Sequence, residues 1–337
     1  MNSTKYIEGL NMRKIIYVCL ICVLLVFCVA CNGDNQQMDR LPRKVEESEI
    51  EKTVLFEGEQ CINYICNYAD KLYFTLHYDN GIYEMNVEEN ESRKIDIDIP
   101  DGYEAGVIAT DANGNIYTVF RKEDEYLLVK INSDYEIQFQ KEFTEYTDGN
   151  SVPWAIAADK DEYVYIRMGN VAGDNLFSVF DKKGDFVGTI EGGKDYWIID
   201  AMGRCADGYV YAVLDTRGKT EVERYIVKLV GKNVEFVIQE VGDVSAESYA
   251  CCGIGSGVND DFLIYASNLD CAKGYSYGAE PNKDVGIITE EIKSKASGAR
   301  CLFLDDGRML LVIKTGELQE EQIVMRPNNT MYYIPMK

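Results

Sequence analysis

Histidine, proline and basic residues are scarce in this chain, and each scarcity argues against particular kinds of site, linker or partner. Among 337 residues there is one histidine, His77, so we expect neither a zinc site of Cys and His ligands nor a hydrolytic triad with a His base. Six prolines and no proline-rich segment favour a single domain without internal linkers. The 34 Lys and Arg stand against 57 Asp and Glu, and the resulting net charge of −23 argues against nucleic acid as a partner.

Long apolar runs are also scarce, and the clearest one lies near the N-terminus. Residues 15–30 carry no charge and follow Arg13 and Lys14, but they are shorter than the ~20 residues of a transmembrane helix. The order basic, apolar, small indicates a secretory signal peptide over residues 1–30. An uncleaved signal anchor is the alternative. The first eleven residues have no signal character, so Met1 and Met12 both stay open as the start.

The end of this run resembles a known processing site. Val29 and Ala30 precede Cys31 as in the lipobox of bacterial lipoproteins, although Cys28 stands where Leu is usual. The resemblance implies that Cys31 is lipidated and becomes the first mature residue. The protein would then be anchored on the extracellular side of the bacterial cytoplasmic membrane. Residues 31–50 are polar and are predicted to form a flexible tether, followed by one domain over residues 51–337.

A short phrase occurs six times after the tether. An acidic or Asn/Gly turn precedes a strand that opens with aromatic or branched apolar residues. The copies end 44 to 54 residues apart, at Tyr73, Tyr117, Tyr165, Tyr211, Tyr265 and Leu311. A period of this length in strand-forming sequence predicts the blades of a β-propeller. The second copy divides into four expected strands, at residues 105–110, 115–121, 126–131 and 136–142.

Two further segments bear on the predicted ring. Residues 53–56 form a spare strand before the first repeat, and we expect it to pair into the last blade and close the ring. The segment 253–257 reads Gly-Ile-Gly-Ser-Gly but no helix follows it. A phosphate-binding turn needs a helix N-terminus, so we interpret this segment as a loop.

The spacing, the turns and the closing strand resemble the six-bladed propellers of the TolB-like and NHL-like group. With its signal, the chain is similar to secreted propeller lipoproteins of Gram-positive anaerobes, and in some of these a propeller precedes a solute-binding domain. The resemblance implies an all-β, six-bladed β-propeller of four-stranded antiparallel blades. We expect this propeller to be a monomer.

Seven cysteines follow the lipidation site, an odd number that cannot all pair within one chain. Cys66, Cys205 and Cys301 fall in corresponding innermost-strand regions, and buried thiols that pack as small apolar groups are expected there. A disulfide between Cys251 or Cys252 and Cys271 stays open, because an extracellular location permits it.

Aromatic residues recur at or just before the expected innermost strands. Exposed there, they would surround the channel mouth and stack on a sugar or hold a peptide side chain. Packing between blades is the alternative. Arg204 and Arg300 lie near the same strands and could bind an anionic ligand group or form structural ion pairs. The aromatic candidates are Tyr64, Tyr103, Trp154, Trp197 and Tyr249.

These observations favour a non-catalytic module that binds a carbohydrate, a peptide or another protein and requires no cofactor. An accessory role in solute uptake, with a transporter or solute-binding protein as partner, is a related hypothesis. The alternative is a metal-dependent hydrolase or lactonase. Similarity to gluconolactonase-like propellers would then imply a divalent ion such as Ca²⁺ in the channel, with Asp200 as one ligand.

Overall fold

The structure is a computed structural model of the whole chain. For some of the residues named next, the structure describes the backbone but not the side chain. The described residues are 48, 51–54, 60–89, 91–143, 152–169, 175–191, 196–216, 222–242, 253–256, 262–267, 271–276, 281–286, 298–304, 308–319, 322–326 and 330–335. They belong to one compact unit, Pro42–Lys337, and the signal segment, the tether up to residue 47 and Cys31 lie outside them.

Five antiparallel sheets have four strands each. In each sheet the strands follow one another in sequence order, and the first strand is the innermost. Blade 1 contains β2 (Ile62–Tyr68), β3 (Lys71–Leu76), β4 (Ile82–Asn86) and β5 (Glu91–Lys94). Blade 2 contains β6 (Glu104–Thr110), β7 (Ile116–Lys122), β8 (Glu125–Ile131) and β9 (Ile137–Glu142). Blade 3 contains β10 (Val152–Ala158), β11 (Val164–Gly169), β12 (Asn175–Phe180) and β13 (Phe186–Glu191).

The next two blades repeat this order. Blade 4 contains β14 (Tyr196–Arg204), β15 (Val210–Thr216), β16 (Val222–Val230) and β17 (Asn233–Gly242). Blade 5 contains β18 (Gly253–Ser256), β19 (Phe262–Ser267), β20 (Cys271–Ser276) and β21 (Pro281–Gly286). The predicted all-β propeller of four-stranded antiparallel blades is therefore confirmed.

The remaining sheet is built from both ends of the propeller. β22 (Gly298–Phe303) pairs with β23 (Arg308–Gln319), β23 with β25 (Thr330–Pro335), and β25 with β1 (Glu51–Val54). An N-terminal strand thus pairs into the last sheet as predicted, with Glu51 opposite Tyr333, but it covers Glu51–Val54 and not the predicted residues 53–56, of which 55 and 56 lie outside the described residues. This composite sheet is not a regular four-stranded blade. β23 is twelve residues long, and its second half pairs with a fifth strand, β24 (Gln322–Arg326).

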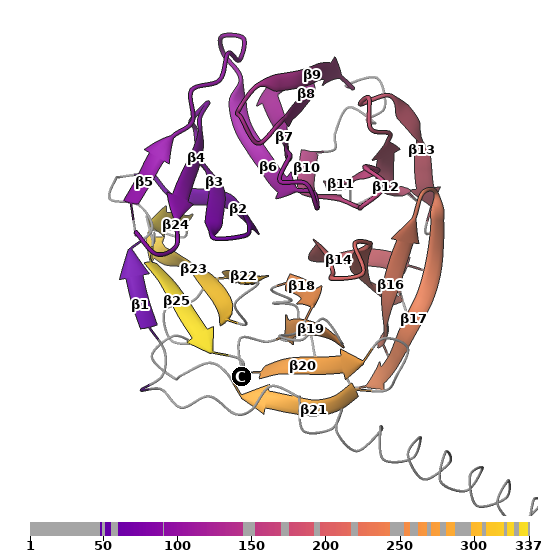
Figure 1. Cartoon of the computed structure of the whole chain (residues 1–337). Coiled ribbons are helices and arrows are strands. Elements are labelled where there is room, and N and C mark those ends of the chain that lie inside the picture. Colours follow the sequence, from indigo (N-terminus) through magenta and orange to yellow (C-terminus); the bar gives the residue numbers. More distant parts are fainter. Residues whose placement is uncertain are drawn as a thin grey trace, which may run out of the picture. The chain divides into compact units, whose positions relative to one another are not determined.

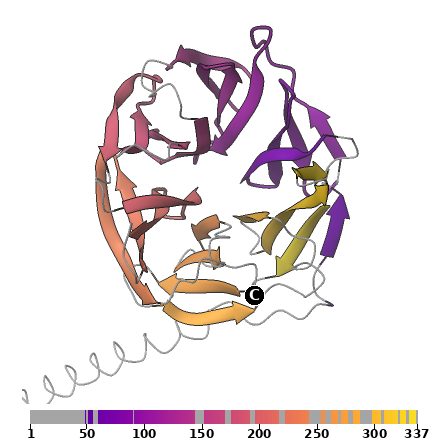
Figure 2. The same ribbon diagram turned by 180° about the vertical axis from the view of Figure 1, so that it is seen from behind.

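The innermost strands form a closed circuit. β2 contacts β6, β6 contacts β10, β10 contacts β14, β14 contacts β18, β18 contacts β22, and β22 contacts β2. Figure 1 shows the sheets around this circuit, and Figure 2 shows the same arrangement from behind. Hydrogen bonds cross between sheets, as when Thr110 Oγ1 donates to the Asn67 carbonyl at 2.6 Å and Asn67 Nδ2 donates to the Phe303 carbonyl at 3.3 Å.

The repeated Asp and Tyr of the sequence phrase stabilise the turn between the first two strands. In blade 2, Asp111 Oδ1 accepts the amides of Asn113 at 2.8 Å and Asn115 at 3.0 Å, and Tyr117 donates its hydroxyl to Asp111 Oδ2 at 3.3 Å. Such side-chain bonds to the following backbone are what makes Asp favourable in turns. Blades 3 and 4 repeat the contact through Tyr165 to Asp159 at 3.0 Å and Tyr211 to Asp207 at 2.9 Å.

The core consists of apolar layers between neighbouring blades. The layer between blades 1 and 2 includes Ile82, Ile116 and Ile131, all fully buried. The next layer, between blades 2 and 3, includes Tyr117 and Val164. Because each layer needs two blades, the repeats cannot bury their apolar faces alone, which explains why the hydrophobic pattern follows the repeat period.

The interpretation of residues 253–257 as a loop is wrong for its described part. Gly253–Ser256 forms the inner strand β18. A Cβ atom on Gly255 would lie 2.6 Å from the Phe303 ring, so this glycine lets neighbouring inner strands approach closely. Gly203 does the same, because its Cβ would lie 2.4 Å from the Ile254 carbonyl oxygen.

The cysteines and the absence of a membrane-spanning helix among the described residues also bear on the sequence predictions. Cys66 and Cys205 are buried free thiols, as expected, and Cys61 is a partly exposed free thiol. Cys271 and Cys301 lie on β20 and β22 with their side chains outside the described set, which also excludes Cys251 and Cys252. Within the described part of the chain, no helix is long and apolar enough to cross a membrane.

Candidate functional site

Four inner strands share an irregularity in their first half. The register between each inner strand and its neighbour shifts there, which is the signature of a β-bulge. A bulge bends the strand and redirects a side chain, and it is common beside functional sites. The shifts lie between Ile62 and Tyr64 in β2, Ala105 and Ile108 in β6, Pro153 and Ala155 in β10, and Ile198 and Met202 in β14.

Trp154 is the residue displaced by the bulge of β10. Pro153 lies opposite Met168 and Ala155 lies opposite Arg167, so no residue of β11 lies opposite Trp154. Its side chain is 44% exposed, one of few large apolar side chains that are open to solvent. Gly169 leaves the space for the indole, because a Cβ there would lie 2.3 Å from the indole Nε1. The bulge and this glycine together present the tryptophan to solvent.

A cation lies against the indole ring. The guanidinium carbon of Arg167 is 5.2 Å from the centre of the Trp154 ring, a cation–π contact. Burial lowers the pKa of Arg167 to about 10, and Tyr64 opposes this shift. Arg167 therefore stays protonated at neutral pH. We call Trp154, Arg167 and Gly169 the tryptophan platform.

Tyr64 connects this platform to blade 1. It lies on β2, and it packs against the apolar layers on both sides of blade 2. Tyr64 also opposes the fall in the pKa of Arg167, so a residue of blade 1 acts electrostatically on blade 3. The alternative that the aromatic candidates pack between blades thus holds for Tyr64 in part.

A second arginine with a buried side-chain nitrogen lies on the inner strand of blade 4. Arg204 is the last residue of β14, and its buried Nε makes no hydrogen bond to any described residue. Burial raises the pKa of the Cys66 thiol, and Arg204 opposes the shift. Cys66 lies on β2, and blades 1 and 4 are separated by two others in the circuit of inner strands. The charge of Arg204 therefore acts on a thiol from a blade that is not its neighbour, a coupling that the sequence did not reveal.

The other predicted site residues are not brought to the platform by any described contact. Tyr103 precedes β6 and is 8% exposed, its hydroxyl donates to Glu125 Oε2 at 3.2 Å, and Lys122 Nζ lies 5.7 Å from its ring centre. It is therefore buried in the apolar layer between blades 1 and 2, with its hydroxyl at the β7–β8 hairpin, so the alternative of packing between blades holds for Tyr103. Trp197 and Asp200 lie on β14 and Arg300 on β22 with side chains outside the described set, and Tyr249 is outside it entirely.

The described residues also bear on metal binding and on histidine chemistry. Among them, no three His, Cys, Asp or Glu side chains gather closely enough to hold a metal ion. His77 follows β3 in a turn, with its ring centre 6.0 Å from that of Tyr78. Among the described side chains, the tryptophan platform combines a solvent-exposed indole with a neighbouring arginine.

Comparison with known proteins identifies the fold. No protein family matches the sequence, and no characterised protein resembles it closely enough to match. Many solved structures resemble the fold. A catalytically inactive virginiamycin B lyase from Staphylococcus aureus, solved with quinupristin, aligns with a TM-score of 0.51 and 13% identity, over 86% of this chain and 99% of that one.

Two other propellers align equally well. Regucalcin from Agrobacterium tumefaciens, described as a calcium-binding protein, gives a TM-score of 0.52 and 12% identity over 86% of this chain and 96% of its own. A streptogramin B lyase gives 0.51 and 11% over 85% and 97%. At such identities the similarity establishes a β-propeller and transfers no activity.

Proposed function

We propose that this protein is a membrane-anchored extracellular propeller lipoprotein that acts as a non-catalytic binding module, accessory to solute uptake. The lipid on Cys31 and the tether of residues 31–50 would hold the propeller at the bacterial membrane surface. We further propose that the composite sheet is the sixth blade. The contacts of β22 with both β18 and β2 support this count.

The observation that carries the binding proposal is the tryptophan platform. An indole that is 44% exposed in water loses little by accepting a ligand and gains apolar contact when it does. Its open face can stack on the C–H face of a sugar ring or on a planar peptide side chain. The contact with Arg167 helps to fix the orientation of the ring, and a fixed ring lowers the entropy that binding would cost. The ligand class is therefore a carbohydrate or a peptide.

The test is calorimetry on the full-length chain in a neutral detergent, with a panel of oligosaccharides and peptides. For a ligand that binds, Trp154→Ala should weaken Kd by about ten-fold or more, the loss typical of a buried aromatic anchor. Phe236→Ala is the matched control, because Phe236 is 53% exposed on β17 at the outer side of blade 4. Equal Kd values for Trp154→Ala and wild type would refute the platform as the site.

The alternative function, a metal-dependent hydrolase or lactonase, has its own test. The regucalcin structure is described as that of a calcium-binding protein, and this chain shares its fold. Calcium would then bind in calorimetry, EDTA would reverse the binding, and Asp200→Asn would abolish it. Trp154→Ala should leave calcium binding unchanged. Binding of this kind would replace the non-catalytic proposal, whereas a sugar or peptide signal that depends on Trp154 would support it.

A further inference from the structure

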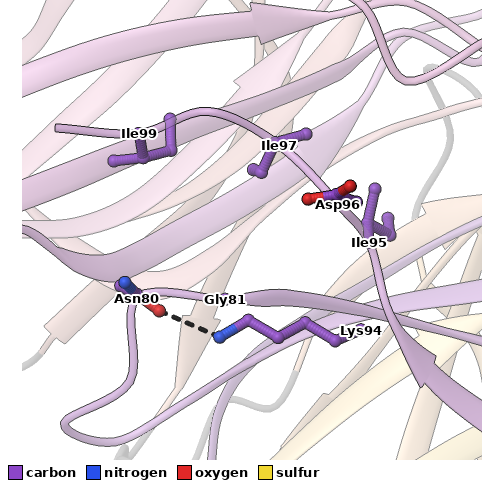
Figure 3. Close-up of a pocket in the computed structure, with 7 residues that line it drawn as sticks. All are labelled: Asn80, Gly81, Lys94, Ile95, Asp96, Ile97 and Ile99. Atoms are coloured by element: carbon purple, nitrogen blue, oxygen red, sulfur yellow. Dashed lines mark hydrogen bonds between the residues drawn. The ribbon is translucent and has the colours of Figure 1, made fainter.

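A cavity of about 340 Å³ lies where blade 1 passes into blade 2, away from the tryptophan platform. Two segments line it: the β3–β4 loop, and the end of β5 with the connection that follows it. Figure 3 shows these segments on opposite sides, joined by the hydrogen bond from Lys94 Nζ to Asn80 Oδ1. The lining residues are Asn80, Gly81, Lys94, Ile95, Asp96, Ile97 and Ile99.

The connection after β5 has the alternation of a β-strand. Ile95 is buried and Ile97 and Ile99 are partly buried, whereas Asp96 and Asp98 are exposed. The two partly buried isoleucines pack on the apolar layer between blades 1 and 2. The isoleucines of the connection therefore pack on this apolar layer, whereas Asp96 and Asp98 are exposed, and Asp96 lines the cavity together with Ile97 and Ile99.

This extended segment is not paired as a strand. The Ile95 amide donates to the Ile82 carbonyl at 2.8 Å and continues the β4–β5 ladder, which ends there. Gln140 Nε2 donates to the Asp98 carbonyl at 3.2 Å. Within the described chain, the amides of residues 96–99 donate no hydrogen bond. An exposed extended segment with open amides is a template for pairing with another chain.

The nearby cations are already engaged by carboxylates. Arg93 forms an ion pair with Glu84, and Lys94 Nζ lies 3.3 Å from Asp79 Oδ1. The charges left uncompensated along the connection are those of Asp96 and Asp98. A strand added beside the connection would place its own alternating side chains opposite these residues, where opposite charges attract. The two carboxylates thus favour a basic partner, and the isoleucines that line one part of the cavity favour apolar residues between the basic ones.

We propose that residues 95–99 form a docking site for an extended peptide of a partner protein in which Lys or Arg alternates with apolar residues. The peptide pairs through its backbone with the connection, as in other recognition by strand addition. Its apolar side chains enter the cavity beside Ile97 and Ile99, and its basic side chains lie opposite Asp96 and Asp98. This proposal is independent of the tryptophan platform and of its ligand.

The test uses a fluorescent, end-capped hexapeptide of alternating Lys and Val, with the full-length chain in neutral detergent and anisotropy as the readout. We expect saturable binding, at least five-fold weaker binding of the alternating Glu and Val peptide, and loss of binding when alternate peptide nitrogens of the Lys peptide are methylated. Methylation removes the donors that pairing needs and keeps the charge. A methylated peptide that binds as well as its parent would overturn the proposal.

Protein variants separate a specific site from general attraction to an acidic protein. The double variant Asp96→Asn, Asp98→Asn should bind the Lys peptide about five-fold more weakly, since two cross-strand charge pairs are lost. The double variant Glu88→Gln, Glu89→Gln removes the same charge from exposed positions at the other end of the β4–β5 hairpin and should bind like wild type. Equal weakening by both double variants, or no saturable binding by wild type, would also overturn the proposal.

Discussion

The buried carboxylate of Glu84 should be a measurable source of stability. Glu84 lies on β4 and is 5% exposed, and it accepts hydrogen bonds from Lys71 Nζ at 3.2 Å, from Arg93 and from the hydroxyl of Tyr135. Tyr135 belongs to blade 2, between β8 and β9, so the cluster joins two blades. Lys71 also donates to the Tyr135 hydroxyl at 3.0 Å.

The substitution Glu84→Gln keeps the size of the side chain and removes its charge. Lys71 and Tyr135 then lose their charged acceptor in a largely buried setting, which costs about 1–3 kcal/mol. An exposed ion pair would contribute only about 0–1 kcal/mol. The assay is urea unfolding of the full-length chain in neutral detergent at pH 7, followed by tyrosine and tryptophan fluorescence. Glu89→Gln, an exposed position on the same hairpin, is the control and should unfold at the wild-type urea concentration.

The same cluster fixes the pH dependence of this difference. Burial alone would raise the pKa of Glu84, but hydrogen bonds from Tyr135, Arg93 and Lys71 outweigh it and hold the pKa below its ordinary value. A carboxyl whose pKa is lowered by folding stabilises the protein above the unfolded pKa of about 4.3, and the contribution is lost as the pH falls through the folded pKa. The gap between wild type and Glu84→Gln should therefore be constant above about pH 5 and shrink below about pH 4. Coincident unfolding curves at pH 7, or a gap that widens on acidification, would refute this reasoning.

Two further predictions concern the inner strands. Gly203→Ala should destabilise the propeller by about 1–3 kcal/mol, because its Cβ would lie 2.4 Å from the Ile254 carbonyl and β14 and β18 would have to separate; a urea midpoint equal to that of wild type would contradict this close contact. Alkylation of the native protein followed by peptide mass mapping should modify Cys61 and leave Cys66 and Cys205 unmodified until urea is added, since only Cys61 is partly exposed; modification of all three at one rate would show that the inner strands open readily.

The blades were predictable because each carries its own local signals. The expected strand 105–110 is β6, and 126–131 falls within β8, each within one residue of the structure. The alternation of buried and exposed residues and the Asp-initiated turns recur within single repeats, so no distant contact is needed to recognise them.

The Gly-rich inner strand β18 was not predicted because its composition favours a loop over a strand. Glycine is unfavourable in a strand by propensity, and three glycines in five residues resemble a loop. In the ring, however, Gly255 faces Phe303 and Ile254 faces Gly203, so the absence of side chains allows three inner strands to come together. The close packing of the inner strands therefore outweighs the low strand propensity of glycine.

Part of the candidate site could likewise be predicted from local sequence, and part depends on contacts between residues far apart in the sequence. The sequence proposes Trp154 as a site residue because aromatic residues recur at one position of the repeat. It does not propose Arg167, which lies on a second strand and resembles any half-buried polar residue there. Its place against the indole depends on the bulge in β10 and on Gly169, and neither has a sequence signal of its own. The effect of Arg204 on the pKa of Cys66 likewise joins residues of blades that are not neighbours in the ring. A repeat pattern therefore specifies the blade, whereas a contact such as that of Arg167 with the Trp154 ring depends on residues that differ between blades and that the pattern does not mark.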